Sequence, residues 1–151
     1  MKTVFNIKAL LLLFIGCFMA YSCDTFSDDE SDTPTESTKE VDGTWKVIKA
    51  SRNGTDITKF MDFSQFTLIL KDDNTYTMQN YLPFLVKKDG TWNVDDPQYP
   101  FKLLFNETGS PTEVMAMLNY PVVNGKRQIS LSFSPGCPSN IYTYVFEKVS
   151  N

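Results

Sequence analysis

The most informative absence in this sequence of 151 residues is histidine, which does not occur at all. Without an imidazole the chain lacks the commonest general base and the commonest nitrogen ligand for metal ions. No serine lies in the Gly-x-Ser-x-Gly arrangement that presents a catalytic nucleophile. The adjacent acids Asp72-Asp73 and Asp95-Asp96 lack the pattern of a calcium-binding loop, and we interpret them as solvated turns. We therefore predict that the protein is not an enzyme and has no catalytic residues, metal site or cofactor.

An excess of basic side chains is also absent. Residues 41–151 hold eleven acidic and eleven basic side chains, so this part of the chain is neutral. Nucleic-acid-binding domains present clustered Lys and Arg, and we therefore expect no nucleic-acid partner. Residues 24–40 are different, with seven carboxylates against Lys39 alone. Because this segment is also rich in Ser and Thr and poor in apolar residues, we predict that it is a disordered acidic tether.

Long apolar runs are limited to one, at residues 9–20, which is shorter than the roughly 20 residues that a membrane-spanning helix needs. Two lysines precede the run, and small residues follow it up to Cys23. A basic start, an apolar centre and small residues before a cleavage point are typical of a secretory signal peptide. We predict that residues 1–22 are a signal peptide that is removed.

The residues before Cys23 resemble a lipobox, in which small residues precede a cysteine that is acylated and becomes the mature N-terminus. Tyr21 departs from the strict pattern, and Ala20 stands where the pattern prefers leucine. The resemblance implies that Cys23 is lipidated and that the protein is anchored to a membrane. Two alternatives remain: an ordinary signal peptidase would leave an unmodified Cys23, and cleavage at Cys17 would leave apolar residues in the mature tail.

With Cys17 removed and Cys23 acylated, Cys137 has no intramolecular partner, and we expect no disulfide. Cys137 lies in a Pro-Gly-Cys-Pro sequence, where a reactive thiol is one interpretation. Reactive thiols need an activating neighbour, whereas free cysteines usually pack as small hydrophobic residues. We predict that Cys137 is packed.

An acidic run, Ser27-Asp28-Asp29-Glu30, follows within ten residues of Cys23. It is similar to the export signal of Bacteroidetes lipoproteins, which sends the anchored protein to the outer face of the outer membrane. The resemblance implies a lipid-anchored protein of the outer membrane, exposed at the cell surface. The alternative is a solvated acidic spacer with no signal function.

Residues 41–151 have the length of one domain and alternate apolar and polar residues with the period of β-strands. Asn53-Gly54 and Asn124-Gly125 are typical of hairpin turns, and residues 56–63 are compatible with one helical turn. About eight antiparallel strands with tight turns favour an up-and-down β-barrel, which leaves no exposed edge strand. A β-sandwich is the alternative. The predicted strands cover residues 44–51, 66–70, 76–78, 92–94, 101–105, 114–123, 128–134 and 141–149.

The sequence Asp-Gly-Thr-Trp occurs twice, at residues 42–45 and 89–92, each time at the start of a predicted strand. We assign Gly43, Trp45, Gly90 and Trp92 a structural role, because glycine permits a sharp entry into the strand and the large ring can close the end of a barrel.

Together with the hairpin sequence at residues 71–77, these motifs resemble the lipocalin-like lipoproteins of Bacteroidetes, a group largely without assigned function. In lipocalins the first-strand tryptophan is packed by an arginine from the end of the barrel, whereas this chain offers Lys148.

The resemblance implies a barrel that binds a small amphipathic or glycan-derived ligand. An eight-stranded barrel is either filled by side chains or able to hold one small ligand. Twelve large residues favour a filled interior, and we therefore expect ligand contacts at Tyr81, Phe84 and Tyr99, which lie in loops that contain prolines. The alternative function is a non-catalytic accessory subunit that binds a protein partner in an outer-membrane complex. The twelve residues are Trp45, Phe66, Leu68, Leu70, Tyr76, Trp92, Phe101, Phe105, Leu131, Phe133, Tyr144 and Phe146.

Overall fold

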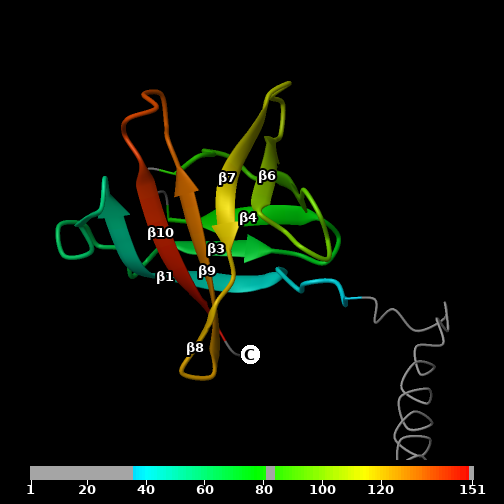
Figure 1. Ribbon diagram of the computed structural model, residues 1–151. Helices are drawn as coiled ribbons and strands as arrows, with labels where there is room; N and C mark the ends of the chain where they lie inside the picture. The colour runs from blue at the N-terminus through cyan, green and yellow to red at the C-terminus, as the bar shows by residue number, and fades with distance from the viewer. Residues whose placement is uncertain (1–35, 81–83, 150–151) are drawn as a thin grey trace, which may run out of the picture. The chain divides into compact units, whose positions relative to one another are not determined.

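The computed structural model of the protein describes residues 36–80 and 84–149, which belong to one compact unit, Glu36–Asn151 (Figure 1). Every regular element in these residues is a β-strand, and no helix occurs among them. The strands are β1 (Gly43–Arg52), β2 (Thr55–Asp56), β3 (Thr67–Leu70), β4 (Thr75–Gln79), β5 (Gly90–Val94), β6 (Lys102–Glu107), β7 (Glu113–Asn119), β8 (Val122–Val123), β9 (Lys126–Phe133) and β10 (Tyr142–Lys148).

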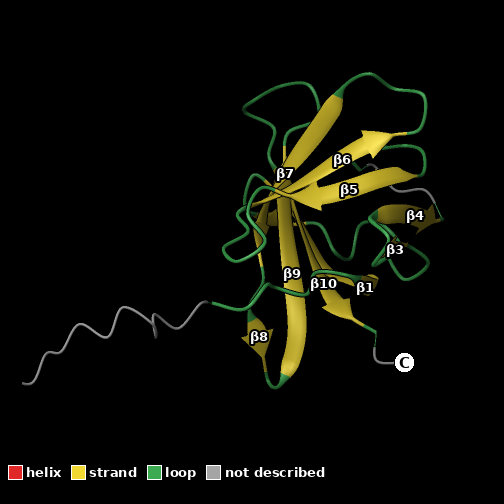
Figure 2. Ribbon diagram, turned by 90° about the vertical axis from the view of Figure 1, so that its right-hand side faces the viewer, coloured by secondary structure: helices red, strands yellow, loops and turns green. Residues whose placement is uncertain are grey.

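Eight of the strands form a closed ring. The order is β1-β3-β4-β5-β6-β7-β9-β10, and β10 pairs back onto β1 through residues 45–52. All the pairings are antiparallel, which confirms the predicted up-and-down barrel and excludes the β-sandwich. The two-residue strands β2 and β8 lie outside the ring, and the hairpin of β8 and β9 extends beyond one end of the barrel (Figure 2).

Tight turns set the register of the flanking strands. Asn124 and Gly125 have φ angles of 52° and 77°, the left-handed pair that a two-residue hairpin requires. Asn53 and Gly54 have the same geometry between β1 and β2, with φ angles of 49° and 80°. The expected helical turn at residues 56–63 is wrong, because this segment begins with β2 and continues as turns. The Asp56 carboxylate accepts a hydrogen bond from the backbone N–H of Thr58, so the capping contact forms without a helix.

The barrel interior is filled by side chains. Strand β9 illustrates the pattern, since Ile129, Leu131 and Phe133 are buried while the residues between them are partly exposed. Ten of the twelve residues predicted to fill the interior are buried, and Trp92 is half-buried against the core. Phe101 is an exception: it is 61% exposed and immediately precedes β6, at the end of the barrel, where its carbonyl accepts a hydrogen bond from the backbone N–H of Leu118 at 2.8 Å.

Residues 36–42, which lead into β1, are attached to the barrel by hydrogen bonds. The backbone N–H of Lys39 donates to the carbonyl of Pro97 at 2.8 Å, and Arg127 donates to the carbonyl of Glu40 at 3.2 Å. Val41 is buried in the core. The last residues of the predicted tether therefore belong to the folded unit, a difference that composition alone does not reveal.

Candidate functional site

The loop aromatics expected to contact a ligand lie in different environments. Phe84 is 5% exposed and packs in the centre of the core, with ring centroids 5.3 Å from Phe133 and 5.7 Å from Phe66. This position corrects the expectation of an exposed ring, because a loop that enters the barrel carries Phe84 inward. Tyr99 is 51% exposed, and Tyr81 lies outside the described residues. Phe84 and Tyr99 therefore do not form a common recognition surface.

The first Asp-Gly-Thr-Trp segment closes one part of the barrel. Trp45 has no exposed surface, and its indole N–H donates to the carbonyl of Val41 at 3.0 Å. Lys148 lies over the Trp45 ring, with Nζ 5.9 Å from the ring centroid. Gly43 has a φ angle of +135°, and a Cβ at this position would overlap the Lys148 side chain. Lys148 thus covers the tryptophan in the place where the lipocalin resemblance has an arginine.

The second Asp-Gly-Thr-Trp segment uses the same residues with different neighbours. The indole N–H of Trp92 donates to the carbonyl of Lys71 at 3.0 Å, and the ring is half-buried. A Cβ on Gly90 would overlap the carbonyl oxygen of Asn106, because β5 and β6 approach closely at this position. The Asp89 carboxylate accepts a hydrogen bond from the backbone N–H of Met78.

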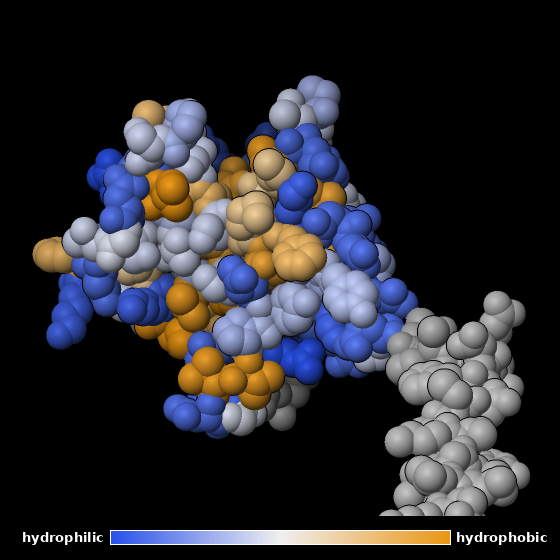
Figure 3. Space-filling model, viewed as in Figure 1, coloured by the Kyte–Doolittle hydropathy of each residue, from blue (hydrophilic) through white to orange (hydrophobic). Residues whose placement is uncertain are grey.

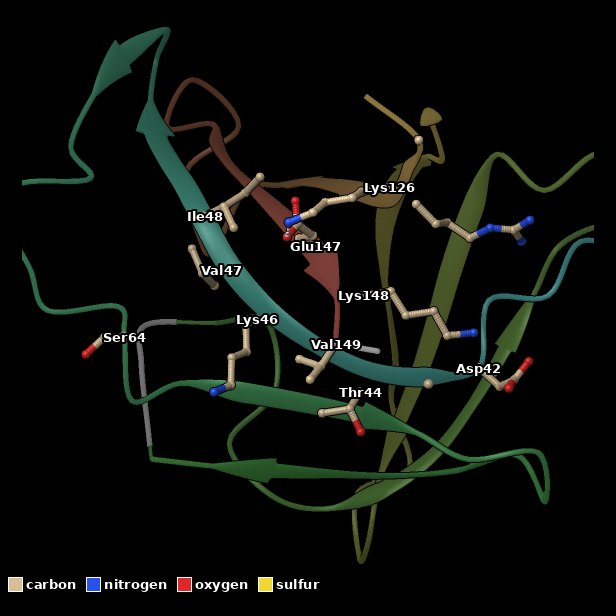
Figure 4. A pocket seen from close by; sticks show the side chains of 13 residues that line it. Asp42, Thr44, Lys46, Val47, Ile48, Ser64, Lys126, Glu147, Lys148 and Val149 are labelled. Atoms are coloured by element: carbon tan, nitrogen blue, oxygen red, sulfur yellow. Dashed lines mark hydrogen bonds and ion pairs between the residues drawn. The ribbon is translucent and has the colours of Figure 1, made fainter. Parts of the chain in front are cut away.

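Because side chains fill the lumen, the hollow that could receive a ligand lies on the outside of the barrel. A groove of about 880 Å³ runs along β1 and the end of β10 and is bounded by the hairpin of β8 and β9 (Figure 4). It is lined by Asp42, Gly43, Thr44, Lys46, Val47, Ile48, Ser64, Gly125, Lys126, Arg127, Glu147, Lys148 and Val149.

Positive charge dominates the polar lining of this groove. Four cationic side chains and two carboxylates border it, although the domain as a whole is neutral. Lys126 is neutralised by an ion pair with Glu147 at 2.7 Å, and Figure 4 shows its ammonium group directed toward that carboxylate. The side chain of Lys46 makes no hydrogen bond or ion pair with any of the residues that the structure describes. The remaining cations are Arg127 and Lys148.

Strand β1, which contains one irregularity, supplies most of the apolar part of the groove. The register between β1 and β10 shifts between Val47 and Lys49, so Ile48 is the extra residue of a β-bulge. Ile48 is 44% exposed and lines the groove together with Val47 and Val149. A second, smaller hollow of about 440 Å³ shares Ile48 and includes the exposed ring of Phe60. Alternation with Trp45 and Val47 already places Ile48 outward, and the bulge reverses the alternation for Lys49 and Ala50 after it.

Cys137 is exposed, so the prediction that it is packed is wrong. Its neighbours are turn residues rather than strand residues, and the turn carries the thiol away from the core. The Ser139 hydroxyl lies 3.1 Å from Cys137 Sγ, and this hydrogen bond lowers the pKa of the thiol.

Across residues 36–80 and 84–149, no three His, Cys, Asp or Glu side chains converge as a metal site would require. Within the same residues, no helix has the length and hydropathy needed to cross a membrane.

Residues 22–147 match a protein family described as "Domain of unknown function (DUF5004)". The match covers the segment predicted to be a tether and almost all of the barrel. Comparison with curated proteins found no match, and comparison with solved structures found none either. The proposal for function therefore depends on the geometry of the groove.

Proposed function

The chain belongs to this family of unknown function, and we propose that it is an outer-membrane lipoprotein whose lipocalin-like barrel binds a small amphipathic ligand. The lipid on Cys23 anchors it, and the acidic run at residues 27–30 directs it to the cell surface. The protein performs no catalysis in this proposal. Its ligand occupies the external groove, in contrast to lipocalins that hold a ligand inside the barrel.

One observation carries the proposal: the lumen is filled, while the outer groove combines apolar and charged lining. Trp45, Phe105 and Tyr144 are among the large side chains that have no exposed surface inside the barrel. The lining of the groove includes Ile48 and Val149 together with four cationic side chains. Sites for small molecules typically combine an apolar lining with a few polar groups that fix orientation. An amphipathic ligand is favoured over a glycan, because no aromatic ring for stacking lines the larger hollow.

Thermal-shift measurements on the mature chain with Cys23→Ser test binding. The probes are decanoate, cholate and maltohexaose, and we expect the first two to raise the melting temperature and the oligosaccharide to leave it unchanged. Ile48→Asp, which places a carboxylate in the apolar part of the groove, should abolish the shift. Met117→Asp is the matched control, since Met117 is a similarly exposed apolar residue on β7. Equal shifts in both variants would place the ligand elsewhere.

Anchoring is tested separately in cells. A clickable palmitate analogue should label the native protein and fail to label Cys23→Ser. Protease added to intact cells should digest the native protein, whereas replacement of residues 27–30 by Ser-Asn-Asn-Gln should protect it. Labelling that persists in Cys23→Ser would contradict the anchor, and protection of the native protein would contradict surface exposure.

A second candidate function, binding of a protein partner, is supported by the outer face of β6 and β7. Met115 and Met117 are about half exposed, and Phe101 is 61% exposed beside the same strands. Figure 3 shows apolar side chains on the face where β7 lies. Exposed Met and aromatic residues are common in protein interfaces. Affinity capture in mild detergent should recover a partner with the native protein and lose it with Met115→Glu/Met117→Glu.

A further inference from the structure

The outer face of β6 and β7 is apolar at its centre and carries one charge of each sign, at opposite ends. We propose that this face binds the same face of a second copy of the chain, so that the protein forms a two-fold symmetric dimer. The inference rests on the second candidate function, because it specifies the partner of the surface described there. The ligand groove, which is lined mainly by β1, β9 and β10, is not part of it.

Strand pairing shows which side chains form this face. Burial alternates along β7, where Ala116 and Leu118 are buried and Met115 and Met117 are about half exposed. Strands β6 and β7 lie side by side, and their register sets Met115 opposite Leu104, so both project from the outside of the barrel (Figure 1). The outward residues of the two strands are Lys102, Leu104, Asn106, Glu113, Met115, Met117 and Asn119.

Lys102 and Glu113 are the only charged side chains among these outward residues. Lys102 lies opposite Met117 and Glu113 lies opposite Asn106, so the two charges are four residues apart along the strands. This separation is roughly 13 Å at about 3.3 Å per residue, too far for an ion pair within one chain. Neither side chain forms an ion pair with any residue in the described part of the chain, and Glu113 accepts one hydrogen bond, from the amide of Asn106 at 3.3 Å. Both charges are therefore available to a partner.

A face with a cation at one end and an anion at the other is complementary to itself when one copy is turned end over end. A two-fold axis that runs across the strands between the copies, at the Leu104–Met115 pair, directs Lys102 of each copy toward Glu113 of the other. The methionines then meet near the centre, where flexible thioether side chains fill irregular gaps. Two-fold dimers that use the same patch on both copies are the commonest symmetric assembly. A partner of one charge sign would be attracted at one end of the face and repelled at the other.

The flanking strands allow close approach, because their outward side chains are small or uncharged. They are Thr91 and Asn93 on β5, and Ser130 and Ser132 on β9. Four strands at a spacing of about 4.8 Å, each about six residues long, make a face of roughly 400 Å². This is about half of the roughly 800 Å² per partner in a standard interface, so we expect a transient dimer with a dissociation constant of about 10–100 µM.

Sedimentation velocity of the mature chain with Cys23→Ser measures dimer formation, at concentrations from about tenfold below to about tenfold above the expected dissociation constant. A reducing agent prevents an intermolecular disulfide through the exposed Cys137. We expect the sedimentation coefficient to rise from the value of a monomer toward that of a dimer. Met115→Glu/Met117→Glu should remain monomeric. Phe60→Glu/Ile141→Glu is the matched control, since these exposed apolar residues lie outside β6 and β7 and should leave the dimer intact.

Charge-reversal variants test the end-over-end arrangement. Lys102→Glu and Glu113→Lys each set like charges against one another and should weaken self-association about tenfold. An equimolar mixture of the two variants should associate as tightly as the native protein, because the face of one variant is then acidic and that of the other basic. Lys49→Glu makes the same charge change at an exposed position of β1 and should have no effect. Circular dichroism and the melting temperature establish that each variant is folded.

The outcomes separate this inference from the second candidate function. A native protein that sediments as a monomer at every concentration would overturn the dimer. Affinity capture of a different protein, lost in Met115→Glu/Met117→Glu, would then still support the second candidate function. A dimer that persists in Met115→Glu/Met117→Glu would show that another face is used and would also overturn the inference. So would a mixture of the two charge variants that associates no more tightly than either variant alone.

Discussion

The two Asp-Gly-Thr-Trp segments open β1 and β5 with the same four residues and acquire different surroundings. In both, the indole N–H donates to a backbone carbonyl at 3.0 Å. Trp45 is completely buried and covered by Lys148, whereas Trp92 is half-buried. Strand β10 pairs with β1 and brings Lys148 over the Trp45 ring. Identical local sequences thus make the same kind of indole hydrogen bond, while the neighbouring strands determine how much of each side chain is buried.

The glycines of the two segments are required for different reasons. Gly43 has a positive φ angle, and its close neighbour is the flexible Lys148 side chain. Gly90 faces the backbone carbonyl of Asn106, which the pairing of β5 with β6 holds in place. A side chain can move aside at low cost, but a backbone in a paired strand cannot.

The largest effect should come from removing the two indoles. Trp45→Ala should lower the free energy of unfolding by about 4 kcal/mol, because it leaves a large cavity and an unpaired Val41 carbonyl. Trp92→Ala should cost about 2 kcal/mol, since part of that ring is already in water. Urea unfolding of the three proteins measures the difference. Equal losses would show that burial does not distinguish the two segments.

Much of the fold could be predicted from sequence. The alternation in residues 128–134 and the Asn-Gly turn before them identify a hairpin, because both depend on local geometry. Closure of the eight strands follows from their number and from the two apolar faces of the last strand. Phe84 and Phe101 were harder to place, since each lies just outside a strand, where alternation carries no information.

The candidate site was much less predictable than the fold. Most of its residues come from β1, β9 and β10, and β1 is distant in sequence from the other two and lies beside β10 only after the barrel closes. Ile48 faces outward by simple alternation with Trp45 and Val47, whereas the β-bulge after it turns Lys49 outward and Ala50 inward, and nothing in the composition of residues 46–50 signals the extra residue. The sequence shows Lys148 where the lipocalin resemblance has an arginine. The position of Lys148 over Trp45, however, depends on the register of β1 with β10.

Adding a methyl group to each glycine separates the two kinds of close approach. Gly90→Ala should cost about 3 kcal/mol, because neither Asn106 nor the paired strand can shift. Gly43→Ala should cost about 2 kcal/mol, mainly through its positive φ angle. Adding Lys148→Ala to Gly43→Ala removes the overlap, so the two changes together should cost less than the sum of the single changes. Additive losses in urea unfolding would contradict this coupling.

Alkaline pH should weaken the barrel near the second segment. Tyr76 pairs with Gly90, is buried and donates its hydroxyl hydrogen to the carbonyl of Lys88 at 2.8 Å. Burial raises the pKa of Tyr76 above its ordinary value of 10.0, and burial raises the pKa of Tyr144 to about 12. Both tyrosines therefore stabilise the fold fully below pH 10, and this contribution is lost as the pH rises further, because the unfolded chain ionises first.

Urea unfolding at intervals between pH 9 and pH 12 measures this loss. Tyr76→Phe should reduce the pH dependence by about one proton released on unfolding, while costing about 1 kcal/mol at neutral pH through the lost hydrogen bond. Tyr99→Phe is the matched control, since Tyr99 is exposed and should leave the pH dependence unchanged. The same slope in Tyr76→Phe as in the native protein would contradict the assignment.

The smallest expected effect concerns the cation that covers only the first segment. Lys148→Met keeps much of the side-chain volume over Trp45 and removes the charge, so it should lower the free energy of unfolding by about 0.5–1 kcal/mol. Lys148→Arg should retain stability, because a guanidinium also packs on an indole face. Lys102→Met, on a strand that does not pair with β1, controls for the loss of one positive charge. The effect of Lys148→Met on the free energy of unfolding is then measured again in a Trp45→Ala background. If the effect disappears, Lys148 stabilises the barrel through the Trp45 ring. If the effect persists, Lys148 acts through another contact, and the first segment differs from the second by burial alone.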